Sequence, residues 1–172
     1  MGTEVERHET NTKKKKGGAE TADLQTEFLF ELSAELEKPL EVGPTPHGYR
    51  RIAYIKGGSV KGPKLTGEVL PGGGDWPLLR PDGVSELDIR LTCHTEAGQL
   101  VYIFGRGIVH MSGEARQRMR RGEAVDPSEY YYRTAAFFET TSEKYGWLNR
   151  IVAVGFDSLA PNKITVRVYG IL

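Results

Sequence analysis

The sequence contains very little cysteine: Cys93 is the single thiol among 172 residues. One thiol cannot form an intrachain disulfide, and it excludes a zinc site built from several cysteines. The lack of a disulfide framework agrees with a reducing compartment, so we expect a cytoplasmic protein. Long apolar runs are also missing, which argues against a membrane-spanning helix. No apolar stretch follows the N-terminal charges, so we expect no secretory signal.

An excess of charge of one sign is absent as well. Lysine and arginine total 23, and aspartate and glutamate also total 23, so the formal net charge is zero. A neutral chain has no overall field that would attract nucleic acid or an anionic membrane surface. We therefore expect neither nucleic acid nor a membrane as a partner.

Glycine and proline, by contrast, are plentiful, with 21 and 9 residues. They interrupt the sequence at short, regular intervals, as turns do in an all-β protein. Residues 1–23 differ, because they contain four consecutive lysines and too few large apolar residues to support a core. The sequence thus predicts a disordered charged leader over residues 1–23 and a single β domain over residues 24–172.

Alternating apolar and polar residues locate the strands of this domain. The predicted strands are 26–37, 49–55, 64–70, 84–95, 100–106, 130–140, 150–156 and 164–172, with a shorter piece at 59–61. Residues 112–121 instead combine helix formers with a candidate N-cap at Ser112 and with Gly122 just beyond, which predicts one short helix. No strand–helix–strand alternation is present, so the pattern predicts a mainly antiparallel all-β fold, a barrel or half-open barrel.

Several segments of this sequence occur together in a known protein family. They are GSVKGPKLTGEVLPGGGDWPLL at 58–79, RPDG at 80–83, DPSEYYYRT at 126–134, FET at 138–140 and YGWLN at 145–149. In this order they resemble domain of unknown function family 3237, and the resemblance covers residues 28–172. It implies a small calycin-like β-barrel that holds a small molecule, and it supplies no agreed catalytic residues.

The glycine-rich loop at 72–77 places an acid, Asp75, beside an aromatic residue, Trp76. Such a loop at the rim of a barrel is typical of the mouth of a ligand site, although a plain flexible turn explains it equally well. On the long strand at 84–95, Asp88 and Arg90 share one face, opposite Leu87 and Leu91. These charges either face water or line the cavity, where Arg90 would bind a carboxylate or an enolate oxygen.

The run Tyr130–Arg133 is the most unusual stretch of the sequence. Tyr131 and Arg133 share one face of a strand with Glu139, six residues further on. One interpretation is half-buried aromatic packing. The other places Tyr131, Arg133 and Glu139 in one cavity as the catalytic set, where they would orient a phenol or carbonyl group and move a proton.

The segment 145–149 is expected to form a tight turn that closes one end of the barrel. Trp147 either fills the core or contacts a ligand, and Asn149 either caps a turn or binds a polar ligand atom. The histidines are scattered along the chain, so we expect no metal site. Cys93 lies on the apolar face of its strand, where packing is its expected role.

These patterns predict a protein that binds a small organic ligand. We expect it to use no cofactor. The leading hypothesis is a cofactor-independent lyase, isomerase or cyclase that acts on a phenolic or carbonyl compound. The alternative is a non-catalytic binding or structural module whose barrel is filled by side chains. A sheet with two apolar faces must cover the second one, so we also expect a homodimer or larger homo-oligomer.

Overall fold

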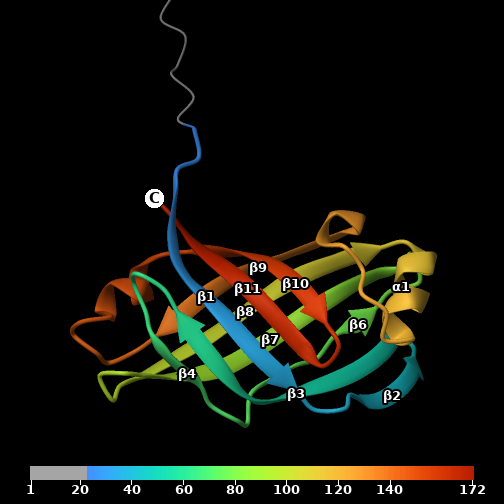
Figure 1. Cartoon of the computed structure of the whole chain (residues 1–172), viewed down its shortest axis with the longest axis horizontal. Coiled ribbons are helices and arrows are strands. Elements are labelled where there is room, and N and C mark those ends of the chain that lie inside the picture. The colour runs from blue at the N-terminus through green and yellow to red at the C-terminus, as the bar shows by residue number, and fades with distance from the viewer. Residues whose placement is uncertain (1–22) are drawn as a thin grey trace, which may run out of the picture.

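The computed structural model describes residues 23–172, so the predicted leader lies outside the described residues except for Asp23. Eleven antiparallel strands form one sheet, which closes into a barrel of eight strands (Figure 1). The order around the barrel is β1-β11-β10-β9-β8-β7-β4-β3, and pairing of β1 with β3 closes the ring. This arrangement confirms the predicted antiparallel β-barrel.

The strands differ widely in length. The short β5 and β6 lie between β3 and β7 as β4 does, and β2 is added beside β3 outside the ring. The bounds are β1 Thr26–Leu36, β2 Leu40–Thr45, β3 Gly48–Lys61, β4 Gly67–Val69, β5 Gly74–Asp75, β6 Leu78–Leu79, β7 Val84–Thr95, β8 Leu100–Met111, β9 Tyr130–Glu139, β10 Ala153–Ala160 and β11 Lys163–Ile171.

Several strand boundaries differ from the prediction. Strand β10 runs over Ala153–Ala160 and not 150–156, the predicted strand 64–70 is reduced to β4, and β2 was not expected. Gly57 and Gly58 were expected to end a strand, but β3 runs through them to Lys61. The reason is a close approach of β1: a Cβ atom at Gly58 would lie 1.9 Å from the carbonyl oxygen of Ser33. Strand β8 likewise continues past its expected end, because residues 107–111 pair with β7 and β9.

Alternation along the strands separates the inside of the barrel from the outside. On β7, Leu87, Leu91 and Cys93 are buried, whereas Glu86 and Arg90 are exposed. The apolar face is therefore the interior, and the charged face lies outside. Each fully buried large apolar side chain stabilises the fold by roughly 1.5–3 kcal/mol. Two apolar clusters fill the barrel, and Ile89 packs against both.

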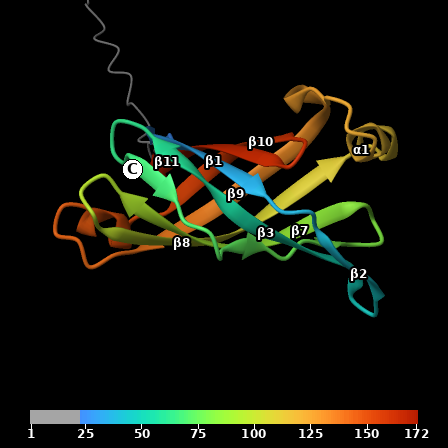
Figure 2. The same cartoon turned by 60° about the horizontal axis from the view of Figure 1, so that its bottom comes forward.

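The predicted helix is present as α1, Gly113–Arg120, at the end of the barrel where β2 lies (Figures 1 and 2). The Ser112 hydroxyl accepts a hydrogen bond from the backbone N–H of Ala115, which confirms the expected N-cap. Ala115 is buried against Val109 and the neighbouring apolar side chains of one cluster. The helix thus closes this end of the barrel.

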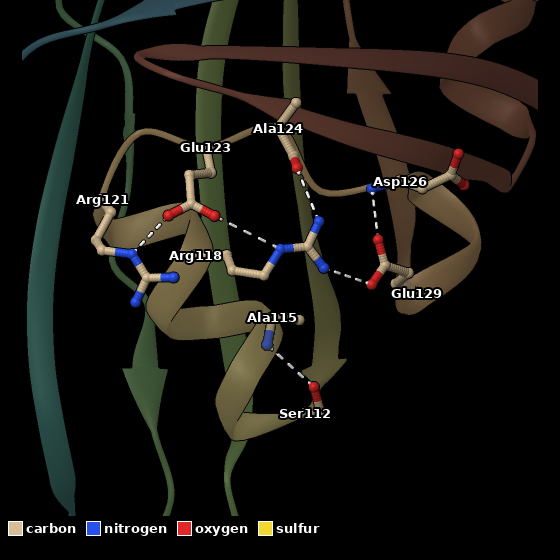
Figure 3. A network of polar contacts seen from close by, with 8 residues as sticks. All are labelled: Ser112, Ala115, Arg118, Arg121, Glu123, Ala124, Asp126 and Glu129. Atoms are coloured by element: carbon tan, nitrogen blue, oxygen red, sulfur yellow. Dashed lines mark hydrogen bonds and ion pairs between the residues drawn. The ribbon is translucent and has the colours of Figure 1, made fainter.

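A network of polar contacts holds the segment after α1 (Figure 3). Arg118 donates to Glu129 at 2.7 Å and to the carbonyl oxygen of Ala124 at 3.1 Å. Arg121 donates to Glu123 at 2.6 Å. These helix arginines therefore bind the protein's own acids and carbonyl groups.

At the other end of the barrel, the expected turn at 145–149 is a short 3₁₀ helix, η2, Gly146–Arg150. A second 3₁₀ helix, η1, Pro127–Glu129, precedes β9 and begins with Asp126 as its cap. Within the described part of the chain, no helix has the length and apolar character needed to cross a membrane.

Candidate functional site

Strand β9 carries the three residues expected to form the catalytic set, and alternation decides the face of each. Tyr132 and Thr134 are buried inside the barrel. Tyr131 lies on the opposite face with 52% of its surface exposed, and Arg133 shares that face. The expected position of Tyr131 and Arg133 inside the barrel is therefore wrong, because their strand neighbours occupy the interior.

The register of the sheet aligns Arg133 with side chains from distant parts of the chain. Residues that pair directly across neighbouring strands form one row on the outer face. From β3 to β10, this row contains Arg50, Leu78, Glu86, Ile108, Arg133 and Phe156. A second row beside it pairs Asp88 with Arg106 and Arg106 with Ala135.

All members of these two rows except Phe156 line a groove on the outer face of the barrel. Its volume is about 620 Å³, within the range of roughly 300–1,000 Å³ that is typical of small-molecule sites. The residues that line it combine charge, aromatic rings and apolar surface: Arg50, Trp76, Leu78, Glu86, Asp88, Arg106, Gly107, Ile108, Tyr131, Arg133, Ala135 and Val154, together with the buried Leu87 and Thr134. Four of the residues expected at the site, Trp76, Asp88, Tyr131 and Arg133, thus lie together here.

Aromatic rings hold Arg133 in the groove. Its guanidinium carbon lies 4.2 Å from the ring centroid of Phe156 and 5.2 Å from that of Tyr131. One N–H group donates to the carbonyl oxygen of Tyr132 at 2.6 Å. A cation between two rings is stabilised by their quadrupoles, so Arg133 is fixed before any ligand binds.

Arg90 lies at the edge of the groove without lining it. Its guanidinium carbon lies 5.6 Å from the ring centroid of Trp76, and its Nη1 is 3.1 Å from the carboxylate of Asp88. Arg90 therefore connects two residues that line the groove, and it is half-exposed itself.

Three of the expected residues lie elsewhere. Glu139 pairs with Tyr102 on β8. It lies six residues after Arg133, and six residues of extended strand span about 20 Å. The Asn149 side chain accepts from the backbone N–H of Thr140 and donates to its carbonyl oxygen, both at 2.9 Å, so it holds η2 against the end of β9. Trp147 packs against the apolar core. The structure therefore separates Glu139, Trp147 and Asn149 from the groove.

Asp75 is on the inner side of the sheet, beneath the groove. It is 7% exposed, and its carboxylate accepts a hydrogen bond from the backbone N–H of Asp88 at 3.0 Å. Burial raises the pKa of Asp75 to about 7, although the hydrogen bond from Asp88 opposes the rise. Asp75 thus supports the groove from behind and does not contact its space.

A second interior acid, Asp157, was not among the expected residues. It is 5% exposed and accepts from the hydroxyl of Thr134 at 3.2 Å. Burial raises its pKa to about 7 as well. Burial also raises the pKa of Tyr132 well above its ordinary value, and the charges of Asp157 and Asp75 add to the effect. The interior therefore contains polar groups whose ionisation is disfavoured.

The interior contains a much smaller cavity than the groove. One cavity of about 60 Å³ lies among mainly apolar side chains, including Ile89, Ile103 and Phe138. Glycines at 105 and 155 and small residues nearby leave this gap. It is far smaller than a site for a drug-sized ligand. Of these two hollows, the larger is thus the groove, which most of its lining places on the outer face.

The described residues contain no group of three or more histidine, cysteine or acidic side chains placed to bind a metal ion. His94 lies 3.4 Å from Glu68 on the surface. Cys93 is buried, and burial raises the pKa of its thiol to about 12, which favours the unreactive protonated form.

Comparison with known proteins places this barrel among relatives. A family described as "Protein of unknown function (DUF3237)" matches residues 24–171. A UPF0311 protein from Rhodopseudomonas palustris is 34% identical over 152 residues, which cover 88% of this chain and 99% of that protein. Its crystal structure superposes with a TM-score of 0.84.

Two further solved structures are similar. A β-barrel-like protein from Acinetobacter baumannii has 33% identity and a TM-score of 0.78, over 90% of this chain and all of that one. An enzyme from Penicillium herquei has a TM-score of 0.67 at 22% identity, over 90% of this chain and 99% of that one. The last likeness concerns the fold alone.

Proposed function

The chain belongs to the DUF3237 family of proteins of unknown function, so we infer its activity from its site. We propose that the groove binds a small phenolic or carbonyl compound. We further propose that the protein transfers a proton on this compound without a cofactor, as an isomerase, lyase or cyclase does. The observation that carries the proposal is the meeting of carboxylates, a tyrosine hydroxyl and arginines in one hollow of about 620 Å³.

The chemistry follows from the side chains in the groove. In the simplest case, a carboxylate of Asp88 or Glu86 takes a proton from the carbon next to a carbonyl group. The electron pair of that C–H bond forms a carbon–carbon double bond, the π pair of the carbonyl group moves to its oxygen, and Arg133 stabilises the enolate charge. Tyr131 donates a proton to the oxygen, so the product is the enol isomer. The carboxylic acid then releases its proton to solvent and Tyr131 regains one from solvent, which restores both groups.

This assignment retains Tyr131 and Arg133 from the catalytic set expected from the sequence. It replaces Glu139 by the groove acids, because Glu139 does not line the groove. Asp75 and Arg90 hold Asp88 in position. Asp75 accepts a hydrogen bond from the backbone of Asp88, and Arg90 pairs with the carboxylate of Asp88.

Phenylpyruvate is a suitable probe, since it carries a ring, a carbonyl group and an exchangeable carbon-bound proton. We expect the protein to accelerate exchange of that proton for deuterium in D₂O, measured by proton NMR. Asp88→Asn should lower the rate at least tenfold if this acid is the base, whereas Glu139→Gln should retain it. No acceleration over buffer by the wild type, or a loss caused by Glu139→Gln alone, would contradict this proton-transfer scheme.

The filled interior favours one second candidate, a non-catalytic binding module. An internal cavity of about 60 Å³ is too small to enclose such a substrate and to exclude water from its reaction. Under this alternative, probes bind in the groove, and deuterium enters them no faster than in buffer. The same NMR experiment therefore separates the two candidates.

A further inference from the structure

The charged side chains of the groove are not balanced. Two carboxylates line it, and both already have arginine partners from outside the lining. Glu86 is 2.9 Å from Arg80, and Asp88 is 3.1 Å from Arg90. Both pairs are half-exposed, so they neutralise charge locally more than they stabilise the fold. The acids of the groove therefore contribute little net negative charge to it.

The three arginines that line the groove have no such partners. Among residues 23–172, no carboxylate lies within 4.0 Å of Arg50, Arg106 or Arg133. Arg50 donates to the carbonyl oxygen of Trp76, and Arg133 donates to that of Tyr132. A guanidinium has five N–H donors, so most of the donors in this hollow are available to a ligand.

Two of these arginines are close enough to act on one group. Arg133 pairs across the sheet with Ile108, and Arg106 precedes Ile108 by two residues on β8. Diagonal neighbours of this kind have Cβ atoms roughly 7–8 Å apart, a span that two long side chains bridge easily. Guanidinium groups bind carboxylates through paired, charge-assisted hydrogen bonds. The rings of Phe156 and Tyr131 already hold Arg133 in place.

Flat and apolar surfaces surround this pair. Trp76, Leu78, Ile108 and Val154 line the same hollow. A bare inorganic anion would leave these surfaces wet, whereas an aromatic ring covers them. We infer that the groove selects a flat organic anion, an aromatic carboxylate or phenolate, whose charged group binds Arg106 and Arg133. This inference rests on the proposed function and narrows its ligand class.

The test compares two probes of the same shape, 2-naphthoate and the neutral 2-naphthamide. Titration calorimetry on the full chain should give the anion an affinity at least tenfold higher. Arg106→Met should weaken binding of naphthoate about tenfold and leave naphthamide within twofold, since the loss of one charge-assisted contact is the only change. Added salt should reduce the preference for the anion.

Arg167→Met is a matched control. Arg167 also lies on the outer face over two rings, 5.3 Å from the centroid of Phe28 and 5.7 Å from that of Tyr169, but it does not line the groove. We expect it to leave both affinities unchanged. Arg133→Met serves as a second test, with its melting curve recorded because the change also removes the stacking on Phe156.

The outcomes separate this inference from the proposed function. Equal binding of the two probes in the groove would overturn the preference for anions and leave ligand binding intact. Loss of naphthoate binding in Arg167→Met and not in Arg106→Met would also overturn it, because the anion would then sit elsewhere. Failure of both probes to bind at millimolar concentration would contradict the groove as a ligand site altogether.

Discussion

The carboxylate of Asp75, inside the barrel, accepts a hydrogen bond from the backbone N–H of Asp88, whose side chain lines the groove outside. One hydrogen bond thus joins the two sides of the sheet. Asp75 also pairs with Ile89 across the sheet, so the short strand β5 is held against β7 at this point. The backbone of the groove floor therefore depends on an interior acid.

The two interior acids make stability depend on pH. Their pKa values are raised from 3.8 to about 7 in the folded protein, so folding is favoured while they are protonated. This contribution is fully present below about pH 4 and is lost as the pH rises towards 7. For one group the upper limit is of the order of 4 kcal/mol.

Asp157→Asn tests this dependence, because the amide keeps the shape of a protonated carboxyl group. The free energy of unfolding, measured with urea, should fall less between pH 5 and pH 7 in the variant than in the wild type. Glu139→Gln changes an exposed acid and should keep the wild-type slope. Equal slopes in the wild type and Asp157→Asn would contradict the assignment.

Gly105 is required by a close approach of β9 to β8. A Cβ atom there would lie 2.2 Å from the carbonyl oxygen of Ala135, and backbone cannot yield as a flexible side chain can. We expect Gly105→Ala to destabilise the protein by about 1–3 kcal/mol in urea denaturation. Gly146→Ala is the control, since a Cβ atom at Gly146 would have no other atom within 4 Å, and it should be nearly neutral.

Arg118 should stabilise the docking of α1. It contacts Glu129 and the carbonyl oxygen of Ala124, and it lies 3.7 Å from Glu123. Because these groups are partly exposed, Arg118→Met should cost only about 1 kcal/mol. Hydrogen exchange of the α1 amides should accelerate accordingly. Arg120→Met removes an arginine that has no ion pair among residues 23–172, so unchanged exchange is expected there.

The homodimer or larger homo-oligomer expected from the sequence stays a prediction. Aromatic side chains on the outer face support it: Phe137 is 42% exposed and Phe156 is 48% exposed. A second copy of the chain that packs against these rings would remove their apolar surface from water, which favours assembly. Light scattering at micromolar concentration should show an assembly, and a monomer would contradict the prediction.

Local pattern was sufficient to predict much of the fold. The bounds of β7 and the position of α1 follow from alternation and from capping signals at Ser112 and Gly122. The turn at Ala97 and Gly98 also predicts the register of the β7–β8 hairpin, and this register sets Arg106 opposite Asp88. Arg106 was therefore within reach of sequence reasoning.

Other parts of the site depend on contacts that no local pattern contains. Alternation shows that Tyr131 and Arg133 share a face, but the closure of the barrel decides that this face is the outer one. Arg50 reaches the groove only because β3 pairs with β6, and β6 pairs with β7. The burial of Asp157 likewise depends on long-range contacts. A polar residue is expected on the outer face of a strand, but the closure of the barrel places this one on the inner face.

Ligand binding in the outer groove can be followed through the two tryptophans. Trp76 lines the groove, whereas Trp147 packs against the core beyond it. Their indole N–H signals can be assigned in an NMR spectrum with the variant Trp76→Phe and followed during titration with 2-naphthoate. We predict that the Trp76 signal shifts with saturation while the Trp147 signal stays in place. A shift of the Trp147 signal alone, or of neither signal on binding, would contradict the account.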